Sequence, residues 1–231
     1  PTQPAEPTQT LPTAEPTPIP NKSLVVCVGE EPDSLYMYAN SSRSAWSILE
    51  AIYDGPYDQV NYVAQPVIME DVPSVANGDV AVLPVDVKLG DAVVDASGTL
   101  TTLAAGVEVY PAGCNSTDCV KPWDGSSALQ MDQLTATFKF KSGLLWSDGQ
   151  PLKASDSVYS FMVASDAATP VNKKIIDRTT QYQVVDDTTL TWTGVPGYWP
   201  ESFDSVFFSP LPEHALKGLT PNDLLTADSA V

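Results

Sequence analysis

The sequence predicts an α/β protein with mixed β-sheets flanked by helices, and three stretches of the chain support this fold class. Residues 134–161 read as a strand, a turn and a helix in succession. Residues 44–53 have the apolar spacing of an amphipathic helix, and residues 182–192 read as two strands joined by a tight turn. Strand and helix patterns therefore follow one another along 231 residues, a length sufficient to enclose a core.

The strand at residues 134–140 alternates between an apolar and a polar face. The apolar face comprises Leu134, Ala136, Phe138 and Phe140, and the polar face comprises Thr135, Thr137 and Lys139. A period of two residues indicates a strand with one buried face. Ser142 and Gly143 end the strand, and residues 147–150 are typical of a turn.

A helix is expected after this turn. Lys153 has no side-chain oxygen with which to cap a helix, so Ser155 is expected at the N-cap position. The side chains of Val158, Phe161 and Met162 are expected to face the core.

The first part of the chain is expected to contain a buried strand and a helix. Residues 24–29 form a short apolar run, in which Cys27 is expected to be a small buried side chain. The helix at residues 44–53 has one apolar face, and Gly55 is expected to end it as a C-cap. The apolar face comprises Ala45, Trp46, Leu49, Ile52 and Tyr53.

These blocks resemble the sequence pattern of the family 5 solute-binding proteins of ABC importers, which include oligopeptide-, dipeptide- and nickel-binding receptors. Residues 134–161 contain the family's order of a T-F-K strand, an S-D-G turn, a P-L pair and a Y-S pair. E-P-D-S-L at residues 31–35 and P-L-P-E-H at residues 210–214 resemble two further family blocks. The resemblance implies a periplasmic-binding-protein-like fold of type II, in which residues 21–231 form the N-terminal lobe region and the second lobe is absent.

Two regions differ from the family blocks. Residues 1–20 are rich in Pro, Thr and Glu, and we expect them to form a disordered tether. In bacterial proteins of this family such a stalk often follows a lipid-modified cysteine, so the resemblance implies an extracytoplasmic protein anchored through a removed N-terminal segment. Residues 73–131 contain β-like runs and turns, and we expect a β-rich inserted subdomain that is either a structural elaboration or a partner-binding surface.

The cysteines of the predicted insertion suggest a disulfide. Cys114 and Cys119 flank four residues in a turn-rich region, and an oxidising compartment would allow them to close this small loop. A metal site is the alternative, although a C-x4-C pair without further Cys or His nearby is a weak metal motif.

Composition and motifs argue against several classes of function. The formal net charge is −18, from 11 Lys and Arg against 29 Asp and Glu. Nucleic acids and anionic membranes are therefore not expected as partners, because clustered cations bind both. His214 is the single histidine and has no nucleophile at a motif spacing, and Asp186 and Asp187 are expected to lie in a solvated turn. We expect no enzyme activity, no catalytic residue, no metal and no cofactor.

The resemblance also indicates candidate ligand-binding residues. In the oligopeptide receptors the loop before the first helix lines the ligand cleft, and the corresponding positions here are Ser41, Ser42, Arg43 and Ser44. Their hydroxyls and guanidinium are suited to ligand carbonyl or carboxylate oxygens. The same four residues also read as an ordinary helix N-cap region, and the two interpretations are compatible.

The class of ligand stays open at this point. Val171 occupies the position at which the oligopeptide receptors carry an aromatic residue, so one expected stacking surface for peptide is missing. Trp146, Trp192 and Trp199 are candidates for stacking on a sugar.

The resemblance implies that the chain captures a small solute (an oligopeptide, a dipeptide or a sugar) as a monomer and delivers it to the permease subunits of an ABC importer. The alternative is a secreted or surface interaction module that reuses this lobe.

Overall fold

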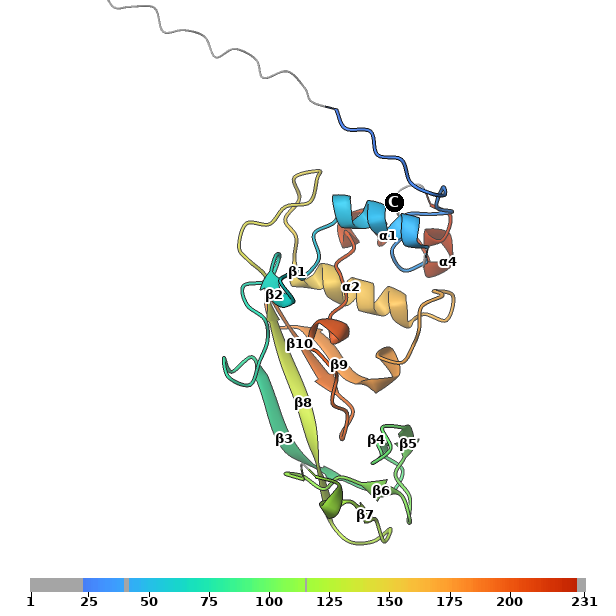
Figure 1. Ribbon diagram of the computed structural model, residues 1–231. Helices are drawn as coiled ribbons and strands as arrows, with labels where there is room; N and C mark the ends of the chain where they lie inside the picture. Colours follow the sequence, from blue (N-terminus) through green and yellow to red (C-terminus); the bar gives the residue numbers. More distant parts are fainter. Residues whose placement is uncertain (1–22, 40–41, 115, 228–231) are drawn as a thin grey trace, which may run out of the picture.

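The structure is a computed structural model that describes residues 23–39, 42–114 and 116–227. Its centre is a four-stranded antiparallel sheet of order β3-β8-β10-β9 (Figure 1). The strands are β3 (Val80–Val87), β8 (Leu129–Lys139), β9 (Thr179–Val184) and β10 (Thr189–Gly194). Helices cover this sheet at one end, and small hairpins extend from the other end (Figure 1). The α/β fold class predicted from the sequence is confirmed.

The remaining elements are short. The helices are α1 (Arg43–Ile52), α2 (Ala154–Ser165), α3 (Glu213–Leu216) and α4 (Pro221–Leu224). Three two-stranded sheets pair β1 (Tyr57–Val60) with β2 (Val63–Pro66), β4 (Ala92–Val94) with β5 (Leu100–Thr102), and β6 (Glu108–Val109) with β7 (Lys121–Pro122). Single 3-10 turns are η1 (Thr117–Cys119), η2 (Ile176–Arg178) and η3 (Asp204–Val206).

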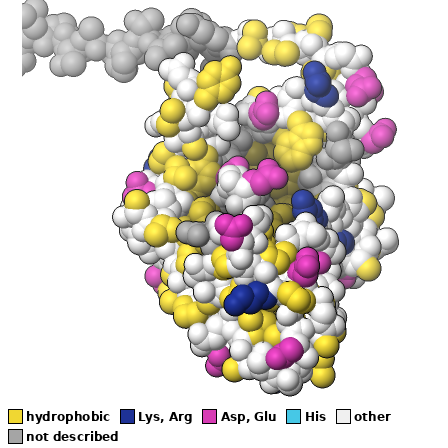
Figure 2. Space-filling view, turned by 60° about the horizontal axis from the view of Figure 1, so that its bottom comes forward, with side chains coloured by type: hydrophobic (Ala, Val, Ile, Leu, Met, Phe, Trp, Pro, Cys, Tyr) yellow, Lys and Arg dark blue, Asp and Glu magenta, His cyan; other side chains and the backbone are white. Residues whose placement is uncertain are grey.

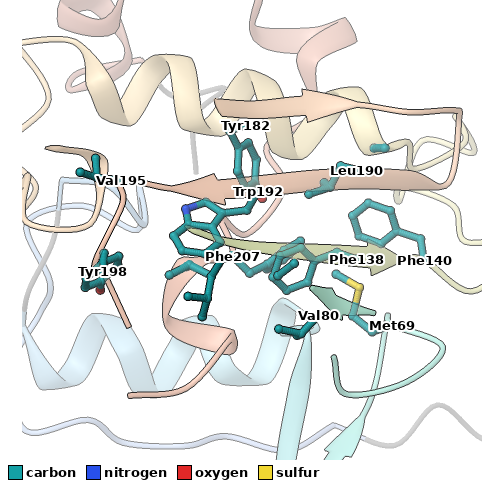
Figure 3. Close-up of a cluster of buried hydrophobic side chains, with 14 of the residues drawn as sticks. Met69, Val80, Phe138, Phe140, Tyr182, Leu190, Trp192, Val195, Tyr198 and Phe207 are labelled. Carbon is teal, nitrogen blue, oxygen red and sulfur yellow. The ribbon is translucent and has the colours of Figure 1, made fainter. Parts of the chain in front are cut away.

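The strand predicted at residues 134–140 is the second half of β8, and its predicted faces are confirmed. The four apolar side chains are buried, whereas Thr135 and Thr137 are half-buried and Lys139 is exposed. Phe138 lies opposite Leu190 in β10, and its ring is 5.2 Å from that of Phe207. Figure 3 shows these side chains gathered on one side of the strands.

Helix α2 begins at Ala154, so the prediction of Ser155 as its N-cap was wrong. Lys153 occupies the N-cap position, and its backbone amide donates to the Asp156 carboxylate at 2.9 Å. An acidic residue at the third helical position can accept this bond whatever the N-cap side chain is. The same buried carboxylate accepts from the Trp146 indole at 3.0 Å and from the Glu213 amide at 3.1 Å. Asp156 therefore joins the start of α2 to the preceding turn and to α3.

Helix α2 is covered on two sides. Val158 and Phe161 pack against the core of the central sheet, as predicted, and Tyr159 and Val163 are buried in a second cluster with residues of the first loop, α3 and α4. Met162 lies between these two faces and is 60% exposed, so the prediction that it is buried was wrong. The sequence pattern showed one apolar face, but two layers contact the helix.

The first part of the chain departs furthest from prediction. Residues 24–28 belong to no strand of the described residues, Leu24 is 87% exposed, and Cys27 is an exposed free cysteine. The predictions of a buried strand and of a buried Cys27 were therefore wrong. An apolar run forms a buried strand only where another strand pairs with it, and none in the described part of the chain does so.

Helix α1 is one residue longer at its start than predicted and ends earlier. Ala45 and Leu49 are buried as predicted, but Trp46 and Ile52 are exposed. The helix ends at Ile52 because Tyr53 is already extended, with φ −117° and ψ 129°. Gly55 therefore is not its C-cap, and that prediction was wrong.

The region predicted as an insertion is continuous with the central sheet. Strand β3 pairs with β8 over its whole length, from Val80 opposite Ala136 to Val87 opposite Leu129. Beyond this pairing, β4 to β7 enclose a separate small core around Val93, Leu103 and Trp123. The predicted boundaries at residues 73–131 and the tether at residues 1–20 stay predictions, and the tether lies outside the described residues.

The two faces of β8 predict unequal responses to substitution. Phe138→Ala and Phe140→Ala are expected to lower the free energy of unfolding by about 3–5 kcal/mol each, because each leaves a cavity in the core. Thr135→Ala and Thr137→Ala are expected to cost nearer ~0.5 kcal/mol. Denaturant midpoints of the four variants measure the difference, and equal losses on both faces would contradict the assignment.

Candidate functional site

The predicted ligand residues before α1 form its N-terminal cap. The Ser42 hydroxyl accepts a hydrogen bond from the Ala45 amide at 3.2 Å and lies 3.2 Å from the Ser44 hydroxyl. Ser44 is buried and donates to the Glu30 carboxylate at 3.5 Å, whereas Arg43 is exposed. Ser42 therefore has the N-cap role that the sequence suggested. The ligand-binding role of all four residues stays a prediction, and Ser41 lies outside the described residues.

Val171 lies in the loop after α2. It is half-buried, and its amide donates to the Thr169 carbonyl at 2.9 Å within the same loop. No hydrogen bond described for Val171 reaches the first turn of α1. The ligand-binding role of Val171 also stays a prediction.

The three candidate stacking tryptophans have different environments. Trp192 is fully buried and donates from its indole to the Thr179 hydroxyl at 2.8 Å. Trp146 is half-buried, and its indole N–H donates to the Asp156 carboxylate. Its ring centroid is 6.4 Å from that of His214. Trp199 is 57% exposed, so it offers the largest free ring face of the three.

The turn at residues 147–150 has a structural role. The Asp148 carboxylate accepts from the Gln150 amide at 3.0 Å and lies 2.8 Å from the His214 ring nitrogen Nε2. These hydrogen bonds, that from the Gln150 amide first, hold the pKa of Asp148 below its usual value. The interaction connects the turn to α3, which accounts for His214 without a catalytic role.

A cavity of about 530 Å³ lies beside Trp199, between three segments of the chain. We call it the hairpin groove; it is lined by residues 94–98 of one segment, by residues 174, 175 and 178 of a second, and by residues 197–199, 201, 202 and 205 of a third, together with Tyr110. The first segment is the turn of the β4–β5 hairpin, the second contains η2, and the third precedes and includes part of η3. Neither Val171 nor the described cap residues of α1 are among its lining residues.

Hydrogen bonds fix the segments around the hairpin groove. The Val94 amide donates to the Pro196 carbonyl and the Val195 amide donates to the Arg178 carbonyl, both at 2.9 Å. The Arg178 guanidinium donates to the Lys174 carbonyl at 3.1 Å and to the Gly98 carbonyl at 3.4 Å. The walls of the groove are thus joined by hydrogen bonds of the chain itself, and small-molecule sites are usually largely preformed in this way.

Gly197 allows two of these segments to approach closely. Its φ is +83°, and a Cβ added there would lie 2.5 Å from the Val94 carbonyl oxygen and 2.7 Å from the Met131 methyl carbon. Both the backbone conformation and the lack of space require glycine.

The charged groups of the hairpin groove balance one another. Its lining contains two positive side chains, Lys174 and Arg178, and two negative ones, Asp95 and Glu201. Hydrogen bonds from Ser97, first from its hydroxyl, lower the pKa of Asp95 below its usual value. Figure 2 shows acidic side chains scattered among hydrophobic and uncharged ones on the face it presents, with few Lys or Arg side chains.

The Tyr198 phenol is affected by one positive and one negative side chain of the groove. Burial raises the pKa of its phenol, the Arg178 charge opposes this, and the Glu201 charge adds to it. The Arg178 guanidinium carbon is 5.8 Å from the ring centroid, in a cation–π arrangement. Arg178 and Glu201 therefore both act on one buried aromatic ring at the base of the groove.

The Sγ atoms of Cys114 and Cys119 are bonded to each other, with their Cα atoms 6.0 Å apart. Among the described residues, no group of three or more His, Cys, Asp or Glu is placed to hold a metal ion. In the same part of the chain, no helix is long and apolar enough to cross a membrane.

One family model matches part of this chain. Residues 120–221 match the model of the family described as bacterial extracellular solute-binding proteins, family 5 Middle. This segment contains β8 and its following turn, α2 and the β9–β10 hairpin. The resemblance to family 5 solute-binding proteins that the sequence suggested is thus confirmed. Among curated proteins, none matches the chain.

Two solved structures illustrate the likeness. The ABC transporter substrate-binding protein CtaP from Listeria monocytogenes aligns with a TM-score of 0.53 and 19% identity, over 88% of this chain and 30% of that one. The oligopeptide-binding protein from Thermus thermophilus, solved in complex with a pentapeptide, aligns with a TM-score of 0.48 and 18% identity, over 80% of this chain and 23% of that one. The likeness to CtaP confirms the fold. The chain spans less than a third of the length of either relative.

Sequence reasoning did not identify the hairpin groove. Arg178 and Tyr198 carried no motif, and three segments far apart in the sequence form the site. One local signal was present: P-G-Y-W-P at residues 196–200 places two adjacent aromatic residues between prolines and outside any expected helix or strand. Such a segment is too rigid for a flexible linker, and in the structure it exposes the Trp199 ring while Tyr198 is buried.

The cysteines predict a simple thiol count. Without reductant, the native protein is expected to expose one reactive thiol, that of Cys27, and denaturation is expected to add none. Reduction is expected to raise the count to three. A thiol-reactive chromogenic reagent measures each state, with Cys27→Ser as the control that removes the native signal. Three thiols before reduction would contradict the Cys114–Cys119 pairing.

Two factors are expected to make the substitution Gly197→Ala destabilising. Gly197→Ala and Gly78→Ala both place a Cβ at positive φ, at a cost of about 1–2 kcal/mol. Only Gly197→Ala also meets neighbouring atoms, because nothing lies within 4 Å of a Cβ at Gly78. The free energy of unfolding is expected to fall by a further ~1–3 kcal/mol for Gly197→Ala. Equal denaturant midpoints for the two variants would refute the close approach.

Proposed function

We propose that this chain is part of an extracytoplasmic solute-binding component of an ABC importer, which captures a peptide or a similar small solute. The observation that carries the proposal is the match of residues 120–221 to the extracellular solute-binding family. This matched segment contains the buried strand β8 and the helix α2 that Asp156 holds to its neighbours. Its fold is also that of CtaP, which is described as an ABC transporter substrate-binding protein.

The chemistry of the chain supports binding rather than bond-making. His214 lies 2.8 Å from Asp148 in a structural contact, and Asp186 accepts from the Thr188 amide at 2.9 Å within the β9–β10 turn. These polar groups, the first that sequence reasoning examined for catalysis, are used in holding turns. What the structure offers a ligand is hydrogen-bonding and aromatic surface.

Arg43 is the residue of the predicted ligand set best placed to contact a solute. It is exposed in the first turn of α1, and its guanidinium is suited to a peptide carboxylate or carbonyl oxygen. Ser44 is buried against Glu30, so we assign it to orienting the loop. Ser41, Ser42 and Val171 complete the proposed contacts.

The proposed location and partners of this protein are those of an extracytoplasmic solute-binding receptor. We propose that the protein lies outside the cytoplasm, with residues 1–20 as the tether to a lipid anchor, that it acts as a monomer, and that the permease subunits of the importer receive its solute. The acidic composition agrees with an exposed, soluble receptor that has no nucleic-acid partner.

One observation favours the alternative of a protein-interaction module. The side chains of Leu24, Val25 and Val26 are exposed, as are Trp46 and Ile52 of α1. Exposed apolar side chains in such numbers are typical of surfaces that another protein covers. A partner protein rather than a small solute would then be the ligand.

Uptake of labelled peptide by cells of the source organism tests the proposal. Disruption of the gene is expected to abolish most uptake of a labelled pentapeptide, and the wild-type gene is expected to restore it. A gene carrying Arg43→Ala is expected to restore about a tenth or less, since a charge-assisted hydrogen bond contributes roughly 1.5–3 kcal/mol.

Lys88→Ala is the matched control, because Lys88 is an exposed cation in the turn between β3 and β4. It is expected to restore uptake fully. Peptide uptake that is unchanged after gene disruption would contradict the proposed function.

A further inference from the structure

Trp199 is a fixed aromatic ring with an open face. The preceding Tyr198 is buried, and its amide donates to the Val195 carbonyl at 3.0 Å. Pro200 follows and restricts the backbone on the other side. The indole is nevertheless 57% exposed in the lining of the hairpin groove. A large flat ring with a positioned backbone and a free face is suited to stacking on an apolar ligand face.

Polar groups of the hairpin groove are placed to bind hydroxyl groups. Arg178 has five N–H donors and uses its guanidinium to hold the Lys174 and Gly98 carbonyls, which leaves N–H groups for a ligand. Glu201 is exposed, lines the groove and offers a carboxylate acceptor. The Ser205 hydroxyl donates to the Ser202 carbonyl at 2.6 Å, so its oxygen can still accept. Donors and acceptors therefore occur together, as a hydroxyl-rich ligand requires.

The charged side chains of the groove give no preference for an ionic ligand. Two cations, Lys174 and Arg178, balance two carboxylates, Asp95 and Glu201, although the chain as a whole carries −18. The lining therefore has no excess charge of either sign to bind an ion, and the charge of the whole chain repels anions. A neutral ligand with many hydroxyl groups can use the donors and the acceptors together.

We propose that the hairpin groove is a carbohydrate-binding site that takes a neutral mono- or disaccharide. The C–H face of a sugar ring stacks on Trp199, and its hydroxyls bond to Arg178 and Glu201. The volume of about 530 Å³ falls within the range of small-molecule sites. This site is separate from the ligand residues proposed at α1, so it does not depend on the transport function.

Titration of the whole chain with maltose, cellobiose and N,N′-diacetylchitobiose tests the proposal. Two-dimensional NMR of the five tryptophan indole N–H groups reports the binding position, with Trp199→Phe identifying the Trp199 signal. At least one saccharide is expected to shift that signal in a saturable way at millimolar concentration. No shift with any of the three would overturn the proposal.

Variants separate stacking from hydrogen bonding. Trp199→Ala is expected to weaken binding about tenfold or more, and Trp199→Phe, which keeps a ring, is expected to retain most of the affinity. Glu201→Gln is expected to weaken it several-fold. Trp46→Ala is the control, because Trp46 is an exposed tryptophan on α1 outside the groove, and it is expected to change nothing.

Two further outcomes count against the proposal. Saccharide binding that Trp199→Ala leaves intact would place the site elsewhere, provided that the remaining indole signals show a folded variant. A shift of the Trp199 signal by trialanine and not by the saccharides would assign the groove to peptides instead.

Discussion

Strand β8 is the constraint on which the rest of the structure depends. It pairs with β3 along one edge and with β10 along the other, so it is the only strand that joins the early and late parts of the chain within the described central sheet. The side chains of its apolar face belong to the main core, in which Phe138 and Phe140 both contact Phe207. A slip of one residue would turn these rings to the other face, and the core would lose two of its large side chains.

Asp156 connects the turn after β8 to the helices α2 and α3. Its carboxylate accepts three hydrogen bonds, from the Trp146 indole and from the amides of Lys153 and Glu213. A buried carboxylate is retained only where donors replace its lost water, and these donors come from a turn, a helix start and a second helix. The start of α2 is thereby held to the turn after β8 and to α3.

The two candidate binding regions differ in how they are built. The first turn of α1 is local in sequence; the family resemblance identified it, and the N-cap hydrogen bond gives Ser42 a structural role of its own. The hairpin groove is assembled from three distant segments, and Gly197 allows two of them to meet. A preassembled concave site with an exposed ring is the stronger basis for ligand binding, because little ordering is required when the ligand arrives.

The sequence by itself determined the family resemblance, the faces of β8, the β9–β10 hairpin and the absence of a nucleic-acid signal, since each is a local pattern of spacing or composition. Only the tertiary structure decided whether an apolar side chain is covered. Residues 24–28 and Met162 are as apolar as any core segment, but no described strand pairs with the first, and the second lies between two packed faces. The hairpin groove and the contact of α2 with α3 were likewise decided by long-range contacts, because Arg178 bonds to Gly98 and Asp156 bonds to Glu213, residues that the chain brings near only by folding.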